Sequence, residues 1–455
     1  MKFPILNIRE TVLSKQLSEK LTEMLSVEKI EQIAKETRFI QRVRNFNAND
    51  FLKCLFVNSF DNSKLSLDSI SESLYEITKT PITKQALDLR FTEESVLFMK
   101  TVLEHALAEI SEKNVGFNFL KTFSEVRIKD STCFQLPDNM QDKYKGSGGA
   151  ASKSSIRIQF EYDFKTGKIY DLSLHPFNKQ DMTDAIDTIN QVTENQLILR
   201  DLGYTCVESM QEIEKRKAFF ISRLHCGTNV YESKNEKFKL IDFMQVYRYM
   251  RLYKITKLIK DVYISEKKYR VRMLIELLPE NVAACKLAKI TKDAQKNGRK
   301  ISESNKTRVF LNLLITNIPT EKLDTSLIHD VYRLRWQIEL IFKAWKGIGK
   351  VHKIKKMKIE RFETYLYSRL LWLIVNWHII TRINHTLYRQ NRLLLSFYKV
   401  YRYLKKHKML WYEAIVVGKN MLIDFLNNLI EVSQRYQIRE RRKDKATVYN
   451  ILLMK

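Results

Sequence analysis

Apolar residues recur at the spacing of α-helices through the first 118 residues. Two such patterns are clear, one through Leu13, Leu17, Leu21 and Leu25 and the other through Phe51, Leu52, Leu55 and Phe56. Because residues three or four positions apart share one face of a helix, both patterns predict helices that bury one side. The N-terminal part of the chain is therefore predicted to be helical.

Two shorter helices are predicted in the same region. Ser66 is the expected N-cap of the first, which carries Ile70 and Leu74, and the second is expected over 83–91, after Lys79-Thr80-Pro81. Two short helices joined by a tight turn suggest a helix-turn-helix that reads DNA, or an ordinary helical hairpin. The turn has no glycine that would decide between them.

From residue 123 the period changes to that of strands and short helices. Strands are predicted over 123–129, 156–162, 168–174, 196–199 and 218–223, and helices over 182–194 and 207–217. A polar loop, 143–155, follows the first strand, and Lys165-Thr166-Gly167 marks a hairpin turn. Three strands followed by helix, strand, helix and strand indicate an α/β core.

The second half of the chain returns to helices after a less regular stretch. Further strands are predicted over 262–264, 269–278 and 308–318, and helices over 326–346, 361–380 and most of the remainder. We therefore divide the chain into five segments. These are a helical DNA-binding segment (1–118), the first part of an α/β core (119–225), a β-rich insertion (226–307), the second part of the core with the helix that carries Glu339 (308–385), and a basic helical segment that is a candidate for dimerisation (386–455).

Composition limits the class of protein. The 455 residues are 44% hydrophobic and include only 11 Gly and 6 Pro, which excludes a disordered or low-complexity chain. The five cysteines are scattered without a C-x-x-C pair, which argues against a disulfide framework or a zinc site. The N-terminus lacks the apolar run of a signal peptide, and 370–380 is too short to span a bilayer. We expect a cytoplasmic protein with no membrane partner.

The charge points to a polyanionic partner. The formal net charge is +27, and 343–358 carries seven lysines and no acidic residue. Residues 386–455 contain 15 Lys and Arg against 5 Asp and Glu. Such segments favour nucleic acid because each neutralised phosphate releases counterions. A basic, solvated surface in a lysine-rich protein is the alternative.

The predicted helix 326–346 carries an ordered set of polar residues. At about 100° per residue, Tyr332, Arg335, Glu339 and Lys346 fall in one stripe. The opposite side is apolar and carries Leu334, Ile338, Ile341 and Trp345. The polar stripe is either a solvated helix face or a row of groups for chemistry.

Two aspartates give that stripe a possible role. Asp130 and Asp201 each stand where a predicted strand ends, although a single aspartate in such a place is commonly a turn residue. Together with Glu339 they would supply three carboxylates, which suit hard cations such as Mg²⁺ or Mn²⁺. Two such ions serve phosphodiester chemistry, and Arg335 and Lys346 would then hold phosphates.

These motifs resemble those of a known family. The spacing from Tyr332 through Arg335 and Glu339 to Lys346 resembles the Y-R-E-K signature of insertion-sequence DDE transposases. Asp201-Leu202-Gly203-Tyr204 is similar to the second-aspartate motif of that group, and Asp130-Ser131-Thr132 to the first. The resemblance spans about 123–380 and implies a ribonuclease-H-like core with a β-rich insertion before the glutamate helix.

The resemblance also implies roles for individual residues. Asp130, Asp201 and Glu339 are implied to be catalytic and to bind the metals, which in the family pattern are two Mg²⁺ or Mn²⁺ ions. Tyr332, Arg335, Lys346 and Lys350 are implied to contact DNA phosphates. Trp336 either packs in the interior or touches the distorted DNA end. In this group a base near the cleaved end stacks on an aromatic residue of the insertion, which the sequence does not identify.

The implied activity is cut-and-paste transposition. Cleavage frees a 3′-hydroxyl, which in this group forms a hairpin end and later attacks target DNA. The implied partners are double-stranded DNA, as terminal inverted repeats and target, and a second copy of the chain in the nucleoid. The alternatives are a ribonuclease-H-like endonuclease that cuts without joining, an inactive protein that binds transposon ends, and a helical scaffold protein with a basic surface.

Overall fold

The computed structural model describes residues 9–42, 46–58, 66–110, 117, 119–148, 152–225, 227–235, 237–298, 300–440 and 448–452. The predicted insertion start at 226, part of the loop 143–155, and 441–447 with 453–455 of the C-terminal segment lie outside them. Two compact units are present. The first contains the described parts of Met1–Phe117, Ser131–Asn178 and Gln337–Tyr449, and the second those of Asn118–Asp130, Lys179–Trp336 and Asn450–Lys455.

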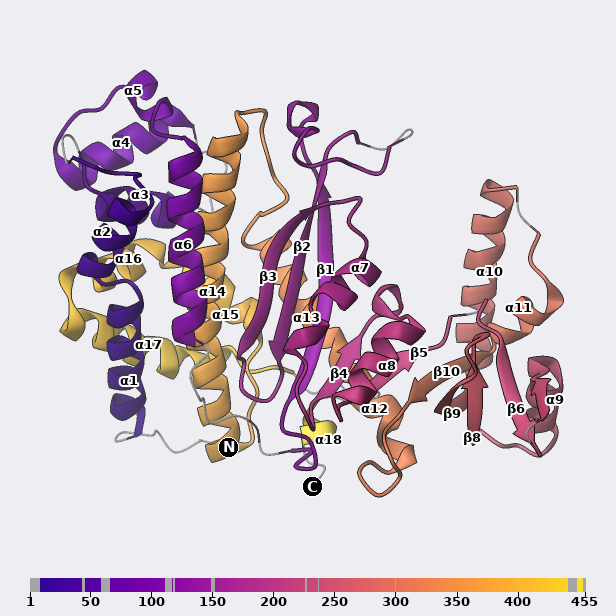
Figure 1. The fold of residues 1–455 in the computed structure, drawn as a ribbon. Helices are drawn as coiled ribbons and strands as arrows, with labels where there is room; N and C mark the ends of the chain where they lie inside the picture. The colour runs from indigo at the N-terminus through magenta and orange to yellow at the C-terminus, as the bar shows by residue number, and fades with distance from the viewer. Residues whose placement is uncertain are drawn as a thin grey trace. The chain divides into compact units, whose positions relative to one another are not determined.

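The first unit is built around one long helix. Helix α14 (Ile359–Asn391) is buried along most of its 33 residues, and α6 (Glu93–Ile110) runs beside it (Figure 1). The predicted apolar helix 361–380 is thus confirmed and extends by another three turns. Of the described helices, including α14, none is long and apolar enough to cross a membrane.

Helices from the two ends of the chain pack together in this unit. Helix α1 contacts α17, and α3 contacts α16, so the helices predicted at both ends are confirmed and share one compact unit. Their bounds are α1 Arg9–Met24, α2 Val27–Glu36, α3 Ala48–Asn58, α15 Phe397–Lys406, α16 Lys408–Val417 and α17 Lys419–Tyr436. A short helix, α18 (Val448–Leu452), follows near the C-terminus.

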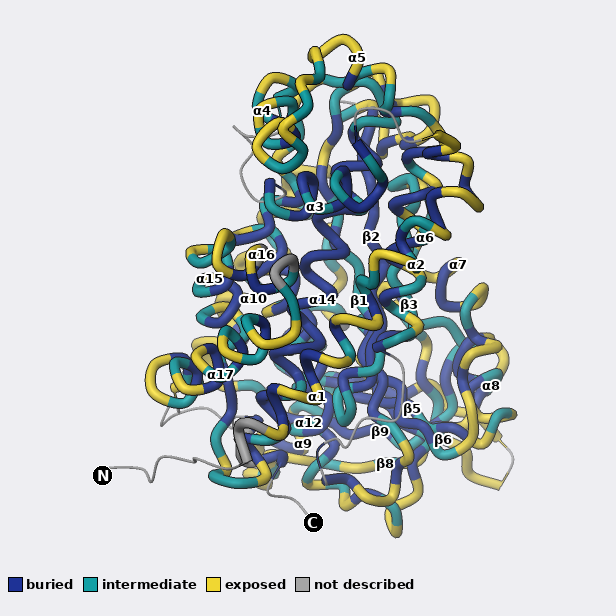
Figure 2. Tube along the Cα trace, turned by 90° about the vertical axis from the view of Figure 1, so that its left-hand side faces the viewer, coloured by how far each residue is buried: buried dark blue, intermediate teal, exposed yellow. Residues whose placement is uncertain are grey.

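The predicted pair of short helices is present, with a shorter second member. Helix α4 (Leu67–Thr78) is capped by Ser66, as expected, and α5 (Lys84–Asp88) starts one residue after the predicted start at Thr83, which is its N-cap. Helix α5 ends at Asp88, three residues before the end of the predicted helix at Phe91. The Phe91 side chain is buried outside the helix. Figure 2 shows exposed residues along both helices, so their outer sides are open to solvent.

The first unit also holds a β-hairpin. Strands β2 (Ser155–Asp163) and β3 (Ile169–Pro176) pair antiparallel, and the other neighbour of β2 is β1 (Val126–Gln135). Gly167 in the turn has φ +80°, and a Cβ there would lie 2.3 Å from the Cγ2 of Thr381. The turn therefore requires glycine for both its backbone conformation and its packing.

The second unit contains the parallel strands. Residues 126–129 of β1 (Val126–Gln135), which belong to this unit, pair with β4 (Leu197–Arg200), and β4 pairs with β5 (Phe219–Arg223), all parallel. The connecting helices are α7 (Asp181–Asp187) and α8 (Val207–Lys215). Helix α7 is shorter than predicted because the chain continues as a 3₁₀ turn at Ile189–Gln191. Alternating helices and parallel strands confirm the predicted mixed α/β core.

The predicted insertion continues this sheet. Beyond β5 the order is β10-β9-β8-β6-β7, and β10 and its successors pair antiparallel. The strands of the predicted insertion are β6 Val230–Lys234, β7 Lys237–Leu240, β8 Lys257–Ile264 and β9 Tyr269–Leu277, whereas β10 (Leu311–Thr316) lies in the segment predicted as the second part of the core. Helices α9 (Phe243–Leu252), α10 (Glu280–Lys296) and α11 (Glu303–Arg308) accompany them, so the segment mixes helices with strands rather than consisting mainly of strands.

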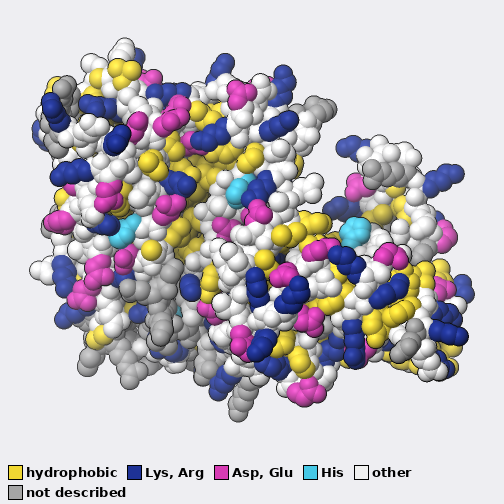
Figure 3. Space-filling model, viewed as in Figure 1, with side chains coloured by type: hydrophobic (Ala, Val, Ile, Leu, Met, Phe, Trp, Pro, Cys, Tyr) yellow, Lys and Arg dark blue, Asp and Glu magenta, His cyan; other side chains and the backbone are white. Residues whose placement is uncertain are grey.

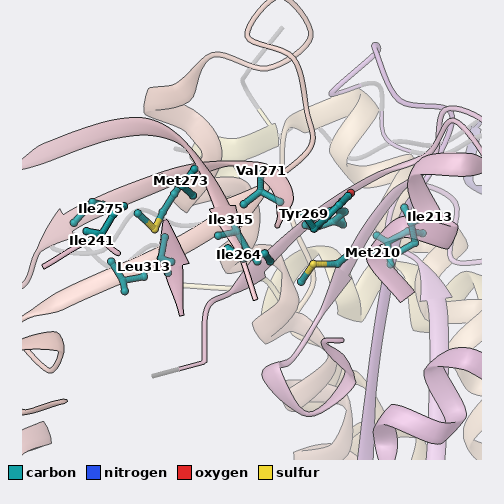
Figure 4. Close-up of a cluster of buried hydrophobic side chains, with 14 of the residues drawn as sticks. Met210, Ile213, Ile241, Ile264, Tyr269, Val271, Met273, Ile275, Leu313 and Ile315 are labelled. Atoms are coloured by element: carbon teal, nitrogen blue, oxygen red, sulfur yellow. The ribbon is translucent and has the colours of Figure 1, made fainter. Parts of the chain in front are cut away.

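One buried hydrophobic cluster joins α8 to the antiparallel strands of the second unit. Met210 and Ile213 of α8 belong to the same buried cluster as Val271, Met273 and residues of β8 and β10 (Figure 4). Burial of this apolar surface is the main force that holds the strands of the insertion against the α/β part.

Candidate active site

Strand register places the two motif aspartates side by side. Lys129 of β1 lies opposite Arg200 of β4, so the next residues along the parallel pair are Asp130 and Asp201. Asp201 follows the last residue of β4, as predicted. The prediction that a strand ends at Asp130 is wrong, because β1 continues to Gln135 with β2 as its other neighbour.

Arg335 joins the two aspartates. Its Nη1 donates to the Oδ2 of Asp130 at 3.0 Å, and its Nη2 lies 3.7 Å from the Oδ1 of Asp201. The Arg335 side chain is 5% exposed, against 18% and 42% for the two aspartates. A buried guanidinium is therefore the shared counter-ion of both carboxylates, which shows that one positive group can lie against the pair.

The signature segment is not one continuous helix. Helix α12 (Ile328–Tyr332) ends before a 3₁₀ turn at Arg333–Arg335, and α13 (Trp336–Gly347) begins after it. A 3₁₀ turn winds about 120° per residue instead of about 100°, so the predicted single stripe is not maintained across the break.

Residues on both sides of the signature segment are buried, unlike those of a solvated helix. The residues predicted to form its apolar side are all buried, which confirms that prediction: Leu334, Ile338, Ile341 and Trp345. Tyr332 and Arg335, which begin the polar stripe, are buried as well. A merely solvated polar face is therefore excluded for these two residues.

Tyr332 is held by backbone and cationic neighbours. Its hydroxyl donates to the carbonyl oxygen of Arg200 at 3.4 Å, and the Arg223 guanidinium lies 5.8 Å from its ring centroid. Burial raises the pKa of Tyr332, against the opposing effect of Arg335 and Arg223. The phenol therefore stays protonated at neutral pH and serves as a hydrogen-bond donor.

The remaining signature residues lie in the first unit. Glu339 and Lys346 are half-buried on α13, and the Nζ of Lys346 donates to the carbonyl oxygen of Cys133 on β1 at 3.1 Å. Lys350 follows α13, and its carbonyl oxygen accepts from Arg369 at 3.1 Å. Lys346 thus contacts β1 at Cys133, which is three residues after Asp130 in the same strand.

The donor set fits a hard divalent cation. Within the part of the chain that the structure describes, no three His, Cys, Asp or Glu side chains are grouped closely enough to hold a metal ion. Asp130 and Asp201 nevertheless offer carboxylate oxygens to one shared positive group, the Arg335 guanidinium. Carboxylate oxygens are the ligands that Mg²⁺ and Mn²⁺ prefer.

Trp336 is exposed rather than packed. Its relative exposure is 53%, although it begins α13 next to buried residues. The interpretation of Trp336 as an interior packing residue is therefore wrong. An exposed indole beside Arg335 is available for contact with a ligand.

Sequence reasoning missed the residues that support the aspartates. Lys129 and Arg200, which directly precede Asp130 and Asp201, are buried. Lys129 forms an ion pair with Asp184 of α7. The signal was present as basic residues within apolar strands, two in Val-Arg-Ile-Lys and one in Leu-Ile-Leu-Arg, because a buried charge in a strand requires a partner.

Comparison with known proteins gives a consistent result. The chain is 29% identical to the transposase for insertion sequence element IS231F of Bacillus thuringiensis subsp. israelensis, over 95% of this chain and 94% of that protein. It is 29% identical to the transposase for IS1151 of Clostridium perfringens, over 96% of each chain. The putative transposase InsL for IS186A of Escherichia coli K12 is 23% identical over 54% of this chain and 63% of its own length.

A family model extends the comparison beyond single relatives. The model described as "Transposase DDE domain" matches residues 121–375, which include Asp130, Asp201 and Glu339. The match covers more than half of the 455 residues and includes the parallel strands, the predicted insertion and α13. This chain therefore belongs to the DDE transposase family.

Proposed function

We propose that this DDE transposase moves an insertion sequence by a cut-and-paste route with hairpin ends as intermediates. The observation that carries the proposal is the pair Asp130 and Asp201, aligned by strand register and bridged by Arg335. A structural role alone does not require two carboxylates to converge on one cation, because such groups repel each other when that cation is absent.

Asp130, Asp201 and Glu339 would together hold divalent cations, Mg²⁺ or Mn²⁺, and two ions in the complete site. When bound, the ions would activate the attacking oxygen and stabilise the leaving one. The support for this assignment is that the carboxylate oxygens of Asp130 and Asp201 are hard ligands and converge on one positive group, the Arg335 guanidinium.

The neighbouring residues would position the DNA. Arg335 and Lys346 supply cations for phosphates at the scissile bond, and Lys350 extends that set along the basic segment. Tyr332 donates a hydrogen bond and forms no covalent bond with DNA, because its phenol is buried and protonated. Trp336 presents an exposed ring to the DNA end.

The strand order supports a ribonuclease-H-like core. The order β3-β2-β1-β4-β5 combines an antiparallel hairpin with three parallel strands, and the hydrogen-bonded β1–β4 pair carries the two aspartates. The division into five segments, with an insertion over 226–307 and flanking helical segments at 1–118 and 386–455, remains a prediction. The substrates would be terminal inverted repeats and target DNA in the nucleoid, paired by a dimer.

The test is substitution of each carboxylate. Asp130→Asn, Asp201→Asn and Glu339→Gln should each reduce Mg²⁺-dependent cleavage of a terminal-repeat duplex by roughly 10³-fold or more, with end binding nearly unchanged. Asp261→Asn, at an exposed ion pair with Arg270, is the control and should cleave normally. Normal cleavage by any of the three carboxylate variants would refute the assignment.

A strand-transfer assay separates the alternatives. Precleaved ends and a target plasmid should give joined products with the wild-type chain. Cleavage without joining would indicate the endonuclease, and binding without either reaction would indicate the inactive end-binding protein.

A further inference from the structure

The residues before the two motif aspartates are both buried cations. Lys129 precedes Asp130 on β1, Arg200 precedes Asp201 at the end of β4, and the two cations are register partners. Neighbouring residues of a strand project to opposite faces of the sheet. Lys129 therefore occupies the face behind Asp130.

Both cations contact one short region around α7. The Nζ of Lys129 lies 2.5 Å from the Oδ2 of Asp184 and donates to the Oγ1 of Thr188 at 3.0 Å. The Nη1 of Arg200 donates to the carbonyl oxygen of Ala185 at 3.5 Å. Residues 184–188 thus receive a contact from the strand of each aspartate.

The Lys129–Asp184 pair is completely enclosed. The two side chains are 0% and 2% exposed. A buried ion pair contributes little net stability compared with apolar residues, but removing one partner leaves an uncompensated charge. Its geometry is therefore narrowly fixed, and the position of β1 next to Asp130 is fixed with it.

We propose that Lys129, Asp184 and Arg200 are positioning residues that hold Asp130 and Asp201 in register for divalent cations. The proposal rests on the function proposed above. Groups behind metal ligands orient those ligands, and their loss commonly costs about 10–100-fold in metal affinity.

The same strand offers a matched comparison. Arg127 is also fully buried and lies on the same face of β1, two residues before Lys129. It donates to the carbonyl oxygen of Gln191 at 2.6 Å and to the Oε1 of Gln196 at 3.2 Å, so these contacts differ from those of Lys129 with Asp184 and Thr188. A general loss of core polar contacts should therefore affect both residues alike, whereas a positioning role should distinguish them.

The experiment measures metal binding directly. Mn²⁺ binding to the full chain on a terminal-repeat duplex is followed by the electron paramagnetic resonance signal of free Mn²⁺, with thermal unfolding in parallel. Lys129→Met should weaken Mn²⁺ binding by about tenfold or more, and Arg127→Met by less than about twofold. Lys129→Arg should bind nearly as the wild type, because it keeps the charge beside Asp184.

A double variant covers the case in which Lys129→Met does not fold. Lys129→Met with Asp184→Leu removes both charges and leaves an apolar pair, which buried sites commonly tolerate. It should fold and still bind Mn²⁺ about tenfold more weakly. Wild-type Mn²⁺ binding by the double variant, or equal weakening by Arg127→Met, would overturn the proposal.

Failure of the proposed function gives a different result. If Asp130→Asn binds Mn²⁺ as tightly as the wild type, the carboxylate assignment is wrong whatever Lys129 does. If Asp130→Asn loses binding while Lys129→Met behaves like Arg127→Met, only the positioning role is wrong.

Discussion

At the scale of single residues, Arg335 pairs with Asp130 and Asp201, the two carboxylates to which a metal ion would also bind. Arg335→Gln removes this competing cation, so Mg²⁺ should raise the melting temperature of the variant more than that of the wild type. Cleavage should fall by roughly 10²–10³-fold, because a phosphate contact is lost as well. Differential scanning fluorimetry with and without Mg²⁺, and a cleavage assay, measure the two effects.

Arg333 provides the control for that prediction. It lies in the same 3₁₀ turn but pairs with Asp330 at 3.7 Å, away from the motif aspartates. Arg333→Gln should leave the Mg²⁺-induced shift unchanged. Equal shifts for wild type and Arg335→Gln would contradict competition for the carboxylates.

Substitution of the two tryptophans of α13 should affect different properties, the stability of the protein for Trp345 and the cleavage rate for Trp336. Trp345 is 1% exposed, so Trp345→Ala should lower the free energy of unfolding by about 3–5 kcal/mol. Trp336 is 53% exposed, so Trp336→Ala should change stability by less than about 1 kcal/mol and reduce cleavage instead. Urea unfolding and cleavage rates test the pair. A large stability loss in Trp336→Ala would show that its exposed ring has a packing role.

At the scale of elements, α12 is fastened to the strands of the predicted insertion. The Nδ1 of His329 lies 3.0 Å from the Oε2 of Glu276 on β9, and Asn312 of β10 donates to the same oxygen. Burial would raise the pKa of Glu276, but hydrogen bonds from His329 and Asn312 outweigh it and lower the pKa to about 2. The helix that leads into Tyr332 therefore depends on an ionised carboxylate.

This anchor predicts a dependence of stability on acid. The pKa of Glu276 is lower in the folded state than its ordinary value of 4.5, so its stabilisation is complete above pH 4.5 and is lost as the pH falls towards 2. The difference in melting temperature between wild type and Glu276→Gln should therefore shrink across that window. Thermal unfolding at several pH values measures it, and a constant difference would contradict the anchor.

At the scale of the whole molecule, positive charge is spread over the surface. The net charge is +27, and Lys and Arg side chains are distributed over the face seen in Figure 3, with Asp and Glu among them. The segment 343–358 remains the densest run of lysines without an acidic residue. Within it Lys358 serves the protein itself, because its Nζ donates to the carbonyl oxygen of Asp88 at 2.8 Å.

Three exposed lysines of that segment should contribute to the salt dependence of DNA binding. Replacing Lys353, Lys355 and Lys356 by Gln should lower the slope of log binding constant against log salt by about 2–3, because each phosphate contact contributes about 0.9. Titrations of a terminal-repeat duplex at several salt concentrations measure the slope. The same change at three exposed lysines outside the predicted DNA-binding segments (Lys121, Lys215 and Lys217) is the control. Equal slopes for both triple variants would contradict a DNA-binding role for the segment.

The sequence by itself determined the local elements, because their signals lie within a few residues. Ser66 caps its helix, the second short helix starts next to Thr83, Gly167 lies in the hairpin turn, and Asp201 follows its strand, as predicted. The prediction of an apolar side for the helix that carries Glu339 was also correct, because the residues that helical spacing places on that side are buried.

Tertiary structure alone decided how those elements share partners. Strand β1 continues beyond Asp130 to Gln135, next to β2. The residues around Asp130 do not show this, because β2 comes from a later part of the chain. Arg335 donates a hydrogen bond to Asp130, which is 205 residues away in the sequence, and Lys129 forms an ion pair with Asp184 of α7. A buried charge is stable only beside its counter-charge, and that counter-charge is brought near by the fold rather than by the neighbouring sequence.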